Sequence, residues 1–128
     1  MADDQLQVEL VAADRTVWSG QATMVIVRTT EGDVGVLRNH APLLSLLVDG
    51  VVEVSPVDGD RFAAAVDGGF VSVANNRVSI LSERAVLGAD VDVEAARADL
   101  EAAEAEDGDE AEERARRAQS RIRAAEKA

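Results

Sequence analysis

The sequence contains no cysteine, and this absence excludes disulfide bonds, thiolate zinc sites and a thiol nucleophile. His40 is the only histidine, which leaves no second imidazole for a metal cluster. The aromatic residues are limited to Trp18, Phe62 and Phe70, so recognition of nucleic acid or sugar by stacking is poorly supplied. We therefore predict no metal site and no cofactor.

Basic residues are also scarce. The 128 residues carry 13 lysines and arginines against 25 aspartates and glutamates, a net charge of −12. Phosphate backbones are bound by Lys and Arg, so no nucleic-acid partner is predicted. No apolar run approaches the roughly 18 residues of a membrane span, and the acidic opening at residues 1–4 lacks the basic start of a secretory signal. These features predict a soluble intracellular protein.

The charge is distributed unevenly and marks a boundary near residue 88. Residues 1–89 have a balance of −6, residues 90–113 a balance of −11, and residues 114–128 a balance of +5. Eight of the nine glycines and both prolines precede residue 90. We predict a β-rich domain at 1–88 and a helical tail at 89–128.

The first part is predicted to consist of short strands. Apolar and polar residues alternate at 6–10, 52–55, 71–73 and 78–80, as in half-buried strands. The apolar run at 24–27 is typical of a strand covered on both faces. Turn residues separate the strands at 31–33, 58–60, 67–69 and 75–76. Such spacing without intervening helices indicates an antiparallel sandwich or barrel.

The tail is predicted to form two helices that break at Gly108, with Asp92 capping the first. The apolar stripes are Val93, Ala96, Leu100 and Ala103 in the first helix, and Ala111, Ala115, Ala118, Ile122 and Ala125 in the second. Because both stripes are mostly alanine, each helix buries little area. We expect a weakly held arm, which is a candidate moving part.

No residue pattern indicates catalysis. His40 has no visible partners for a Ser-His-Asp or metal arrangement and is expected in a loop or interface. Gly68-Gly69 lacks the flanking residues of phosphate-binding loops, so a tight turn is the favoured interpretation. We predict no catalytic residue and no enzymatic activity.

The basic residues of the second helix allow two interpretations. Glu110, Glu112 and Glu113 each precede an arginine by four residues, which favours helix-stabilising pairs with Arg114, Arg116 and Arg117. Arg121, Arg123 and Lys127 have no such glutamate. The helix therefore presents either a solvated charged face or a docking surface for an acidic partner.

Five segments together resemble a known family. They are Val17-Trp18-Ser19-Gly20, then Glu31 to Leu37 with His40 to Leu44, then Ala65 to Phe70, then Val78 to Leu81, and last the acidic-then-basic alanine-rich tail. In this order, over essentially the whole chain, they resemble the epsilon subunit of bacterial F-type rotary ATP synthases. In that family the first segment is an apolar-aromatic-Ser-Gly turn.

This resemblance implies a non-catalytic rotor subunit with a flattened β-sandwich of about ten strands and a C-terminal two-helix hairpin. The sandwich would join the gamma subunit to the c-ring and couple ring rotation to ATP synthesis. The turn at Glu31, Gly32 and Asp33 is expected to contact the c-ring. The segment His40, Ala41, Pro42 and Leu43 is expected to contact gamma. The protein would be peripheral to the cytoplasmic face of the cell membrane, without inserting into it.

The resemblance also implies a regulatory role for the helical arm, which in the family folds against the sandwich or extends along gamma. When extended, it restrains ATP hydrolysis by contacting acidic segments of the catalytic alpha and beta subunits. Arg121, Arg123 and Lys127 are the residues expected to make this contact.

Nucleotide binding is not expected of this chain. Several relatives bind ATP through a hydrophobic-Asp-x-x-Arg-Ala motif at the start of the first helix. Aligning Asp92 with the motif puts Ala95 at the Arg position, and aligning Arg97 puts Glu94 at the Asp position. Neither register reproduces the motif.

A second function class remains open from the residues. The chain could be a free-standing β-sandwich binding module whose helical tail docks on an unrelated acidic protein. Co-purification with a large membrane-bound ATPase would distinguish the two.

Overall fold

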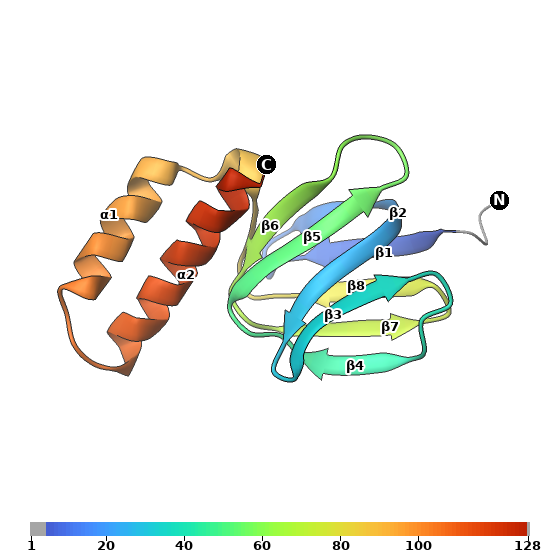
Figure 1. The fold of residues 1–128 in the computed structure, drawn as a ribbon, viewed down its shortest axis with the longest axis horizontal. Helices are drawn as coiled ribbons and strands as arrows, with labels where there is room; N and C mark the ends of the chain where they lie inside the picture. The colour runs from blue at the N-terminus through green and yellow to red at the C-terminus, as the bar shows by residue number, and fades with distance from the viewer. Residues whose placement is uncertain (1–4, 128) are drawn as a thin grey trace.

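The computed structural model describes residues 5–127, so the acidic opening at residues 1–4 lies outside the described residues. Within this range nine strands precede a short 3-10 helix and two α-helices (Figure 1). The strands are β1 (Leu6–Val11), β2 (Thr16–Thr29), β3 (Gly32–Leu37), β4 (Leu43–Leu46), β5 (Gly50–Pro56), β6 (Phe62–Val66), β7 (Phe70–Ala74), β8 (Arg77–Leu81) and β9 (Ala85–Leu87). The helices are η2 (Gly88–Asp90), α1 (Val93–Glu104) and α2 (Asp109–Glu126). No described helix has the length and apolar content needed to cross a membrane.

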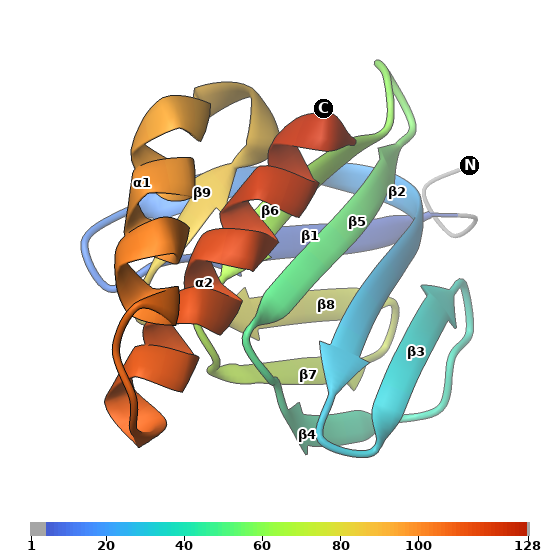
Figure 2. The same ribbon diagram turned by 60° about the vertical axis from the view of Figure 1, so that its left-hand side comes forward.

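The strands form two layers that share the long strand β2 (Figure 2). One layer runs β4-β7-β8-β1 and ends on the first half of β2, which pairs with β1 through residues 16–22. The second half of β2 pairs with β3 on one side and β5 on the other, and that layer continues through β6 to β9. The predicted β-sandwich is confirmed.

One strand pair differs from the antiparallel expectation. β1 and β8 are parallel, with registers from Gln7↔Arg77 to Val11↔Leu81. Parallel neighbours cannot be joined by a hairpin, but these strands are far apart in the sequence and are connected through the rest of the sandwich. The other strand pairs among the described residues are antiparallel.

The expected turn at Val17-Trp18-Ser19-Gly20 is wrong, because these residues lie inside β2. Trp18 pairs with Leu10 of β1, and its ring packs against Phe62 with the ring centroids 5.1 Å apart. Gly20 has a packing reason to be glycine, since a Cβ there would lie 2.8 Å from the Trp18 ring. The small residue makes room for the indole, and the strand continues.

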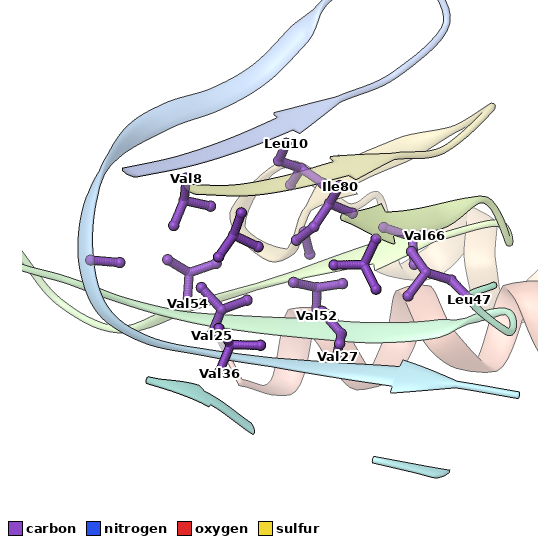
Figure 3. Close-up of a cluster of buried hydrophobic side chains, with 14 of the residues drawn as sticks. Val8, Leu10, Val25, Val27, Val36, Leu47, Val52, Val54, Val66 and Ile80 are labelled. Atoms are coloured by element: carbon purple, nitrogen blue, oxygen red, sulfur yellow. The ribbon is translucent and has the colours of Figure 1, made fainter. Parts of the chain in front are cut away.

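The inward faces of the two layers form one hydrophobic core (Figure 3). The alternation predicted along the strands is confirmed by full burial of Val8, Leu10, Val54 and Ile80. Each buried Val, Leu or Ile side chain contributes about 1.5–3 kcal/mol relative to an exposed one. The buried members of this core all precede α1, so the sandwich has a core of its own.

The predicted turns are confirmed by backbone conformations that few residues adopt. Asn75 and Asn76 connect β7 to β8 with φ angles of 52° and 62°. Gly69 has a φ of 106°, and a Cβ there would lie 1.9 Å from the Leu81 carbonyl oxygen. The Gly68-Gly69 pair is therefore a tight turn that only glycine fits.

The two helices form the predicted hairpin. The Asp92 side chain accepts a hydrogen bond of 3.0 Å from the Ala95 amide, and the break falls at Gly108, which has a φ of 110°. α1 packs on α2, and α2 packs on β5 and β6. Because α2 is covered on two sides, Ser120 and Ala124 are buried although they lie outside the predicted stripe.

Candidate functional site

The turn between β2 and β3 presents its charged residues to solvent. The Thr29 hydroxyl donates to the Gly32 carbonyl at 2.8 Å and accepts from the Glu31 amide at 3.1 Å, which fixes the turn from inside. Glu31, Gly32 and Asp33 are exposed. Arg28 pairs with Asp33 at 3.2 Å, whereas Glu31 has no ion pair among the described residues. The turn is an ordered polar surface with an acidic tip.

The segment from His40 to Leu43 follows the other end of β3 and ends at the first residue of β4. Asn39 precedes it with a φ of 65°, and its amide donates to the Asn76 side-chain oxygen at 2.6 Å. The His40 Nδ1 lies 2.7 Å from the Ala41 carbonyl oxygen. Since a carbonyl only accepts, that nitrogen carries the proton. His40 is thus half-buried in a local turn.

The leucines of β4 divide between the two faces of the sandwich. Leu43 is half-buried and packs against the core, whereas Leu44 and Leu46 are 75% and 63% exposed. Leu46 lies opposite Phe70 of β7, which lies opposite Leu81 of β8, and both of these are also partly exposed. These four side chains, Leu44, Leu46, Phe70 and Leu81, form what we call the apolar outer face.

The apolar outer face was not predicted from the sequence. The run Leu43-Leu44-Ser45-Leu46-Leu47 has too little alternation to show which leucines point outward. A contiguous exposed apolar surface on a folded protein is typical of a protein–protein contact. It adjoins the segment His40, Ala41, Pro42 and Leu43, for which a contact is predicted from the sequence.

Ion pairs join the arm to the sandwich. Arg121 and Lys127, for which the sequence shows no glutamate one turn earlier, therefore do have carboxylate partners. Arg121 Nη2 lies 2.9 Å from Asp67 Oδ2, and Lys127 Nζ lies 3.6 Å from Glu53 Oε1. These partners lie in or beside the strands, whereas the sequence pattern indicates only partners that lie four residues earlier on the same helix. Arg123 is exposed and has no ion pair among the described residues.

The predicted helical pairs are only partly present. Arg117 pairs with Glu113 at 2.8 Å, as expected. Arg114 instead pairs with Glu106 at 3.1 Å, and Arg116 lies 3.9 Å from Asp49. The fold supplies carboxylates that compete with Glu110 and Glu112.

Asp67 is the most deeply buried charged group at this interface. Its side chain is 3% exposed and lies in the turn between β6 and β7, where its amide donates to the Arg84 carbonyl at 3.0 Å. Burial raises the pKa of the Asp67 carboxyl, against the lowering effect of Arg121, Arg117 and Arg84. Asp49 adds to the rise. The carboxylate needs cationic partners to remain charged there.

Arg117 connects the two aspartates. Its Nε lies 3.4 Å from Asp49 Oδ1 and 3.9 Å from Asp67 Oδ1. Burial would lower the pKa of Arg117, but Asp49, Asp67 and Glu113 together raise it. The pKa values of Asp67 and Arg117 are therefore both raised. The Asp67 carboxylate is nearly enclosed, so its burial outweighs the nearby cations. The Arg117 side chain is 31% exposed, so the nearby carboxylates outweigh its burial.

Arginines also line a hollow of about 250 Å³ between the hairpin and the sandwich. Its lining includes Arg84, Arg114, Arg117 and Arg121, together with Asp99. Arg117 and Arg121 are already paired with sandwich carboxylates. Among the described residues no group of three His, Cys, Asp or Glu side chains could hold a metal ion.

Comparisons with known proteins agree over the sandwich. The family model for the ATP synthase delta/epsilon chain, beta-sandwich domain, matches residues 5–88. The ATP synthase epsilon chain of Streptomyces avermitilis is 56% identical over 79 residues, which span 62% of this chain and 64% of that relative. The epsilon chain of Corynebacterium diphtheriae is 54% identical over 84 residues, 65% of this chain and 67% of that one. The chain thus matches less than two thirds of the first relative's length.

Solved structures extend the likeness beyond the sandwich. A chain in the Euglena gracilis mitochondrial ATP synthase structure, comprising OSCP, F1 and c-ring, has a TM-score of 0.73 and 27% identity. The match covers 93% of this chain and 76% of that one, a share that takes in most of the two helices. A chain in the central stalk and c-ring structure from Tetrahymena thermophila has a TM-score of 0.60 at 19% identity and shows the same fold.

Proposed function

The chain belongs to the ATP synthase delta/epsilon family, and on this premise we propose that it is a non-catalytic central-stalk subunit of a rotary ATP synthase. It joins the gamma subunit to the c-ring, so that ring rotation reaches the catalytic alpha and beta subunits and drives ATP synthesis. The match of the sandwich over residues 5–88 carries this proposal. The protein is then peripheral to the cytoplasmic face of the cell membrane.

The arrangement of β3 supports a role in joining two partners. The turn at Glu31–Asp33 and the segment at His40–Leu43 lie at opposite ends of this six-residue strand. At about 3.3 Å per residue the strand separates the turn from the end that leads to His40 by roughly 20 Å. β4 then runs back towards the turn, where the Leu46 carbonyl accepts from the Thr30 amide at 3.1 Å, so the two contact surfaces adjoin at that point.

The two surfaces also differ in chemistry. The exposed acidic turn fits the polar loops of a c-ring, with Glu31 and Asp33 as the contacting side chains. His40, Ala41 and Pro42, continued by the apolar outer face, fit an apolar surface on gamma. Leu43 supports this segment from the core side, and Leu44 and Leu46 make the contact.

We assign regulation to residues 89–128 and partner binding to residues 1–88. In the extended arm, Arg121, Arg123 and Lys127 contact acidic segments of the catalytic subunits and restrain ATP hydrolysis. Arg121 and Lys127 must first leave Asp67 and Glu53, whereas Arg123 is free of ion pairs among the described residues.

The gamma contact is tested by purifying the tagged full chain from cells that make the whole synthase. Leu44→Ser with Leu46→Ser should reduce the gamma subunit and c-ring recovered with the chain by about tenfold, since central apolar contacts dominate interface energy. Val57→Ser, an exposed valine in the loop between β5 and β6, is the matched control and should retain them.

Failure of the unmodified chain to co-purify with any synthase subunit would refute the proposed function. Normal recovery of gamma with the double variant would place the gamma contact away from the apolar outer face.

The regulatory contact is tested by ATP hydrolysis of the assembled enzyme. Truncation before residue 90 should raise hydrolysis, and Arg121→Ala with Arg123→Ala should raise it toward the same level. Each partly exposed pair is worth no more than about 1 kcal/mol, so either single change should act weakly. If truncation activates the enzyme and the double change does not, the arm restrains rotation by another face.

A further inference from the structure

The connection between β3 and β4 is fastened to a turn that lies far away in the sequence. Asn39 belongs to this connection, and its backbone amide donates to the Asn76 side-chain oxygen at 2.6 Å, across 37 positions. The Asn76 side-chain amide donates in return to the Asn39 side-chain oxygen, at a longer 3.5 Å. The connection and the β7–β8 turn meet at the end of the sandwich away from the two helices (Figure 1). Asn39 and Asn76 are called the asparagine clasp below.

The turn that carries Asn76 is held firmly in the sheet. Asn75 and Asn76 are the two residues between β7 and β8, and both have the left-handed backbone conformation. The Asn76 carbonyl accepts from the Gln7 amide at 2.8 Å, which ties the turn to the start of β1. β8 itself pairs with β7 on one side and with β1 on the other. The clasp therefore joins a loop to a rigid part of the sandwich.

The hydrogen bonds of His40 are local by comparison. Its amide donates to the Leu37 carbonyl at 3.1 Å, and its Nδ1 bonds the Ala41 carbonyl at 2.7 Å. Both bonds join near neighbours, so they shape the segment without fixing its position on the sandwich. The bond from Asn39 to Asn76 immediately precedes His40 and does reach the sheet.

We infer that the asparagine clasp positions the segment His40–Leu43 for its partner, with Asn76 as a positioning residue that does not touch the partner itself. A segment that is already ordered loses less conformational freedom on binding, and this raises its affinity. The clasp also sets the start of β4, where the apolar outer face begins at Leu44. The inference rests on the proposed function for the identity of the partner, gamma.

A direct contact would make a different demand on the turn. Asn75 and Asn76 both line an open hollow of about 420 Å³ beside His40, Ala41 and Pro42. Asn75 is exposed and Asn76 is half-buried. A partner side chain seated in the hollow would therefore depend on Asn75 at least as much as on Asn76, whereas positioning depends on Asn76 alone.

Three variants of the full chain separate these two roles. Asn76→Gly removes the side-chain acceptor and keeps the turn, because glycine adopts the left-handed conformation freely and Asn-Gly is a favoured two-residue hairpin turn. Asn76→Asp keeps an oxygen that accepts from the Asn39 amide. Asn75→Gly is the matched control in the same turn, since both bonds of the clasp belong to Asn76.

The first measurement uses the isolated full chain and needs no synthase subunit. Hydrogen exchange of the Asn39 amide, followed by NMR, should become about tenfold faster in Asn76→Gly, because the amide loses its acceptor. The rate should stay within about threefold of the parent in Asn76→Asp and Asn75→Gly. The urea midpoint of unfolding should stay close to that of the parent in all three, since Asn39 is exposed and the turn keeps its conformation.

The second measurement is the recovery of gamma with the tagged full chain from cells that make the whole synthase. Asn76→Gly should lower this recovery about tenfold, because the segment must then be ordered on binding. Asn76→Asp and Asn75→Gly should recover gamma to within about threefold of the parent.

Unchanged exchange of the Asn39 amide in Asn76→Gly, or normal recovery of gamma with it, would overturn the inference. Equal losses of gamma in Asn75→Gly and Asn76→Gly would also overturn it, because the turn would then contact gamma directly. A loss that Asn76→Asp shares, or that follows a lowered urea midpoint, would exclude positioning as its cause. Absence of gamma from the unmodified chain would instead refute the proposed function, and the amide exchange distinguishes that failure because it involves no partner.

Discussion

Removal of residues 90–128 should leave a folded sandwich whose free energy of unfolding falls by only about 2–3 kcal/mol. The main hydrophobic core contains no residue of α1 or α2, and the arm contributes Ala124 to a small second cluster. Truncation uncovers Ala63 and Ala65 and part of Val51 and Val86, equivalent to three or four methyl groups. At about 0.8 kcal/mol for each buried group the loss is 2–3 kcal/mol.

The ion pairs add little to this loss. Truncation removes Arg117 and Arg121, but it also opens Asp67 to water, which solvates the carboxylate in their place. Domains of this size are stable by about 5–15 kcal/mol, so a loss of this magnitude leaves a folded domain.

The assay is urea unfolding followed by the fluorescence of Trp18, the single tryptophan. Trp18 packs against Phe62 and the core, so its signal follows the sandwich and not the arm. The truncated chain should unfold in one cooperative transition with a smaller urea dependence, because less surface becomes exposed. The full chain carrying Arg123→Ala, an exposed change, should unfold like the parent.

Loss of the cooperative transition, or a fall of more than about 5 kcal/mol, would refute this reasoning. The arm would then be part of the folding unit of the sandwich. The proposal that residues 1–88 bind partners on their own would have to be abandoned with it.

Three further predictions concern single sites. The raised pKa of Asp67 means that the native chain binds more protons than the unfolded one between an ordinary aspartate value of about 3.9 and the raised value. The free energy of unfolding of the parent, relative to that of Asp67→Asn, should therefore rise as the pH falls from 7 towards 4. Urea unfolding of both proteins at the two pH values measures this difference, and a difference that stays constant would contradict the prediction. The isolated full chain should show no micromolar binding of ATP by calorimetry, because the motif around Asp92 is broken and Arg117 and Arg121 are paired with carboxylates. A clear micromolar isotherm would contradict this and would indicate the arginine-lined hollow as the nucleotide site. Gly69→Ala should cost roughly 3 kcal/mol or more by thermal unfolding, because its Cβ would meet the Leu81 carbonyl in a left-handed backbone conformation; an unchanged melting temperature would mean that the turn can shift.

The strands and turns could be predicted because their signals are local. The alternation of Leu6, Val8 and Leu10 with polar residues assigns each side chain to a face whatever the strand pairs with. The Asp92 cap depends in the same way on an amide three residues later. The parallel pairing of β1 with β8 has no such signal, because it depends on where distant strands meet.

The contacts of the arm could not be predicted for the same reason. Asp67 and Arg121 are 54 positions apart, and their meeting depends on how the hairpin lies on the sandwich. A hint was present, since Asp67 follows the apolar strand Ala63 to Val66 and is therefore placed to be buried. That hint indicates that a cation is needed, but it does not identify which one.

The long strand β2 and its neighbour β3 also have a mechanical consequence. The ladder between them runs from Met24↔Leu37 to Thr29↔Gly32, and its hydrogen bonds stand perpendicular to the strands. A force passed from the acidic turn at one end of β3 to the His40 segment at the other acts along the strand. The covalent backbone of β3 carries it, and the ladder to β2 holds the strand straight. β3 is therefore stiff along its length, and compliant only where it is pulled sideways from its edge.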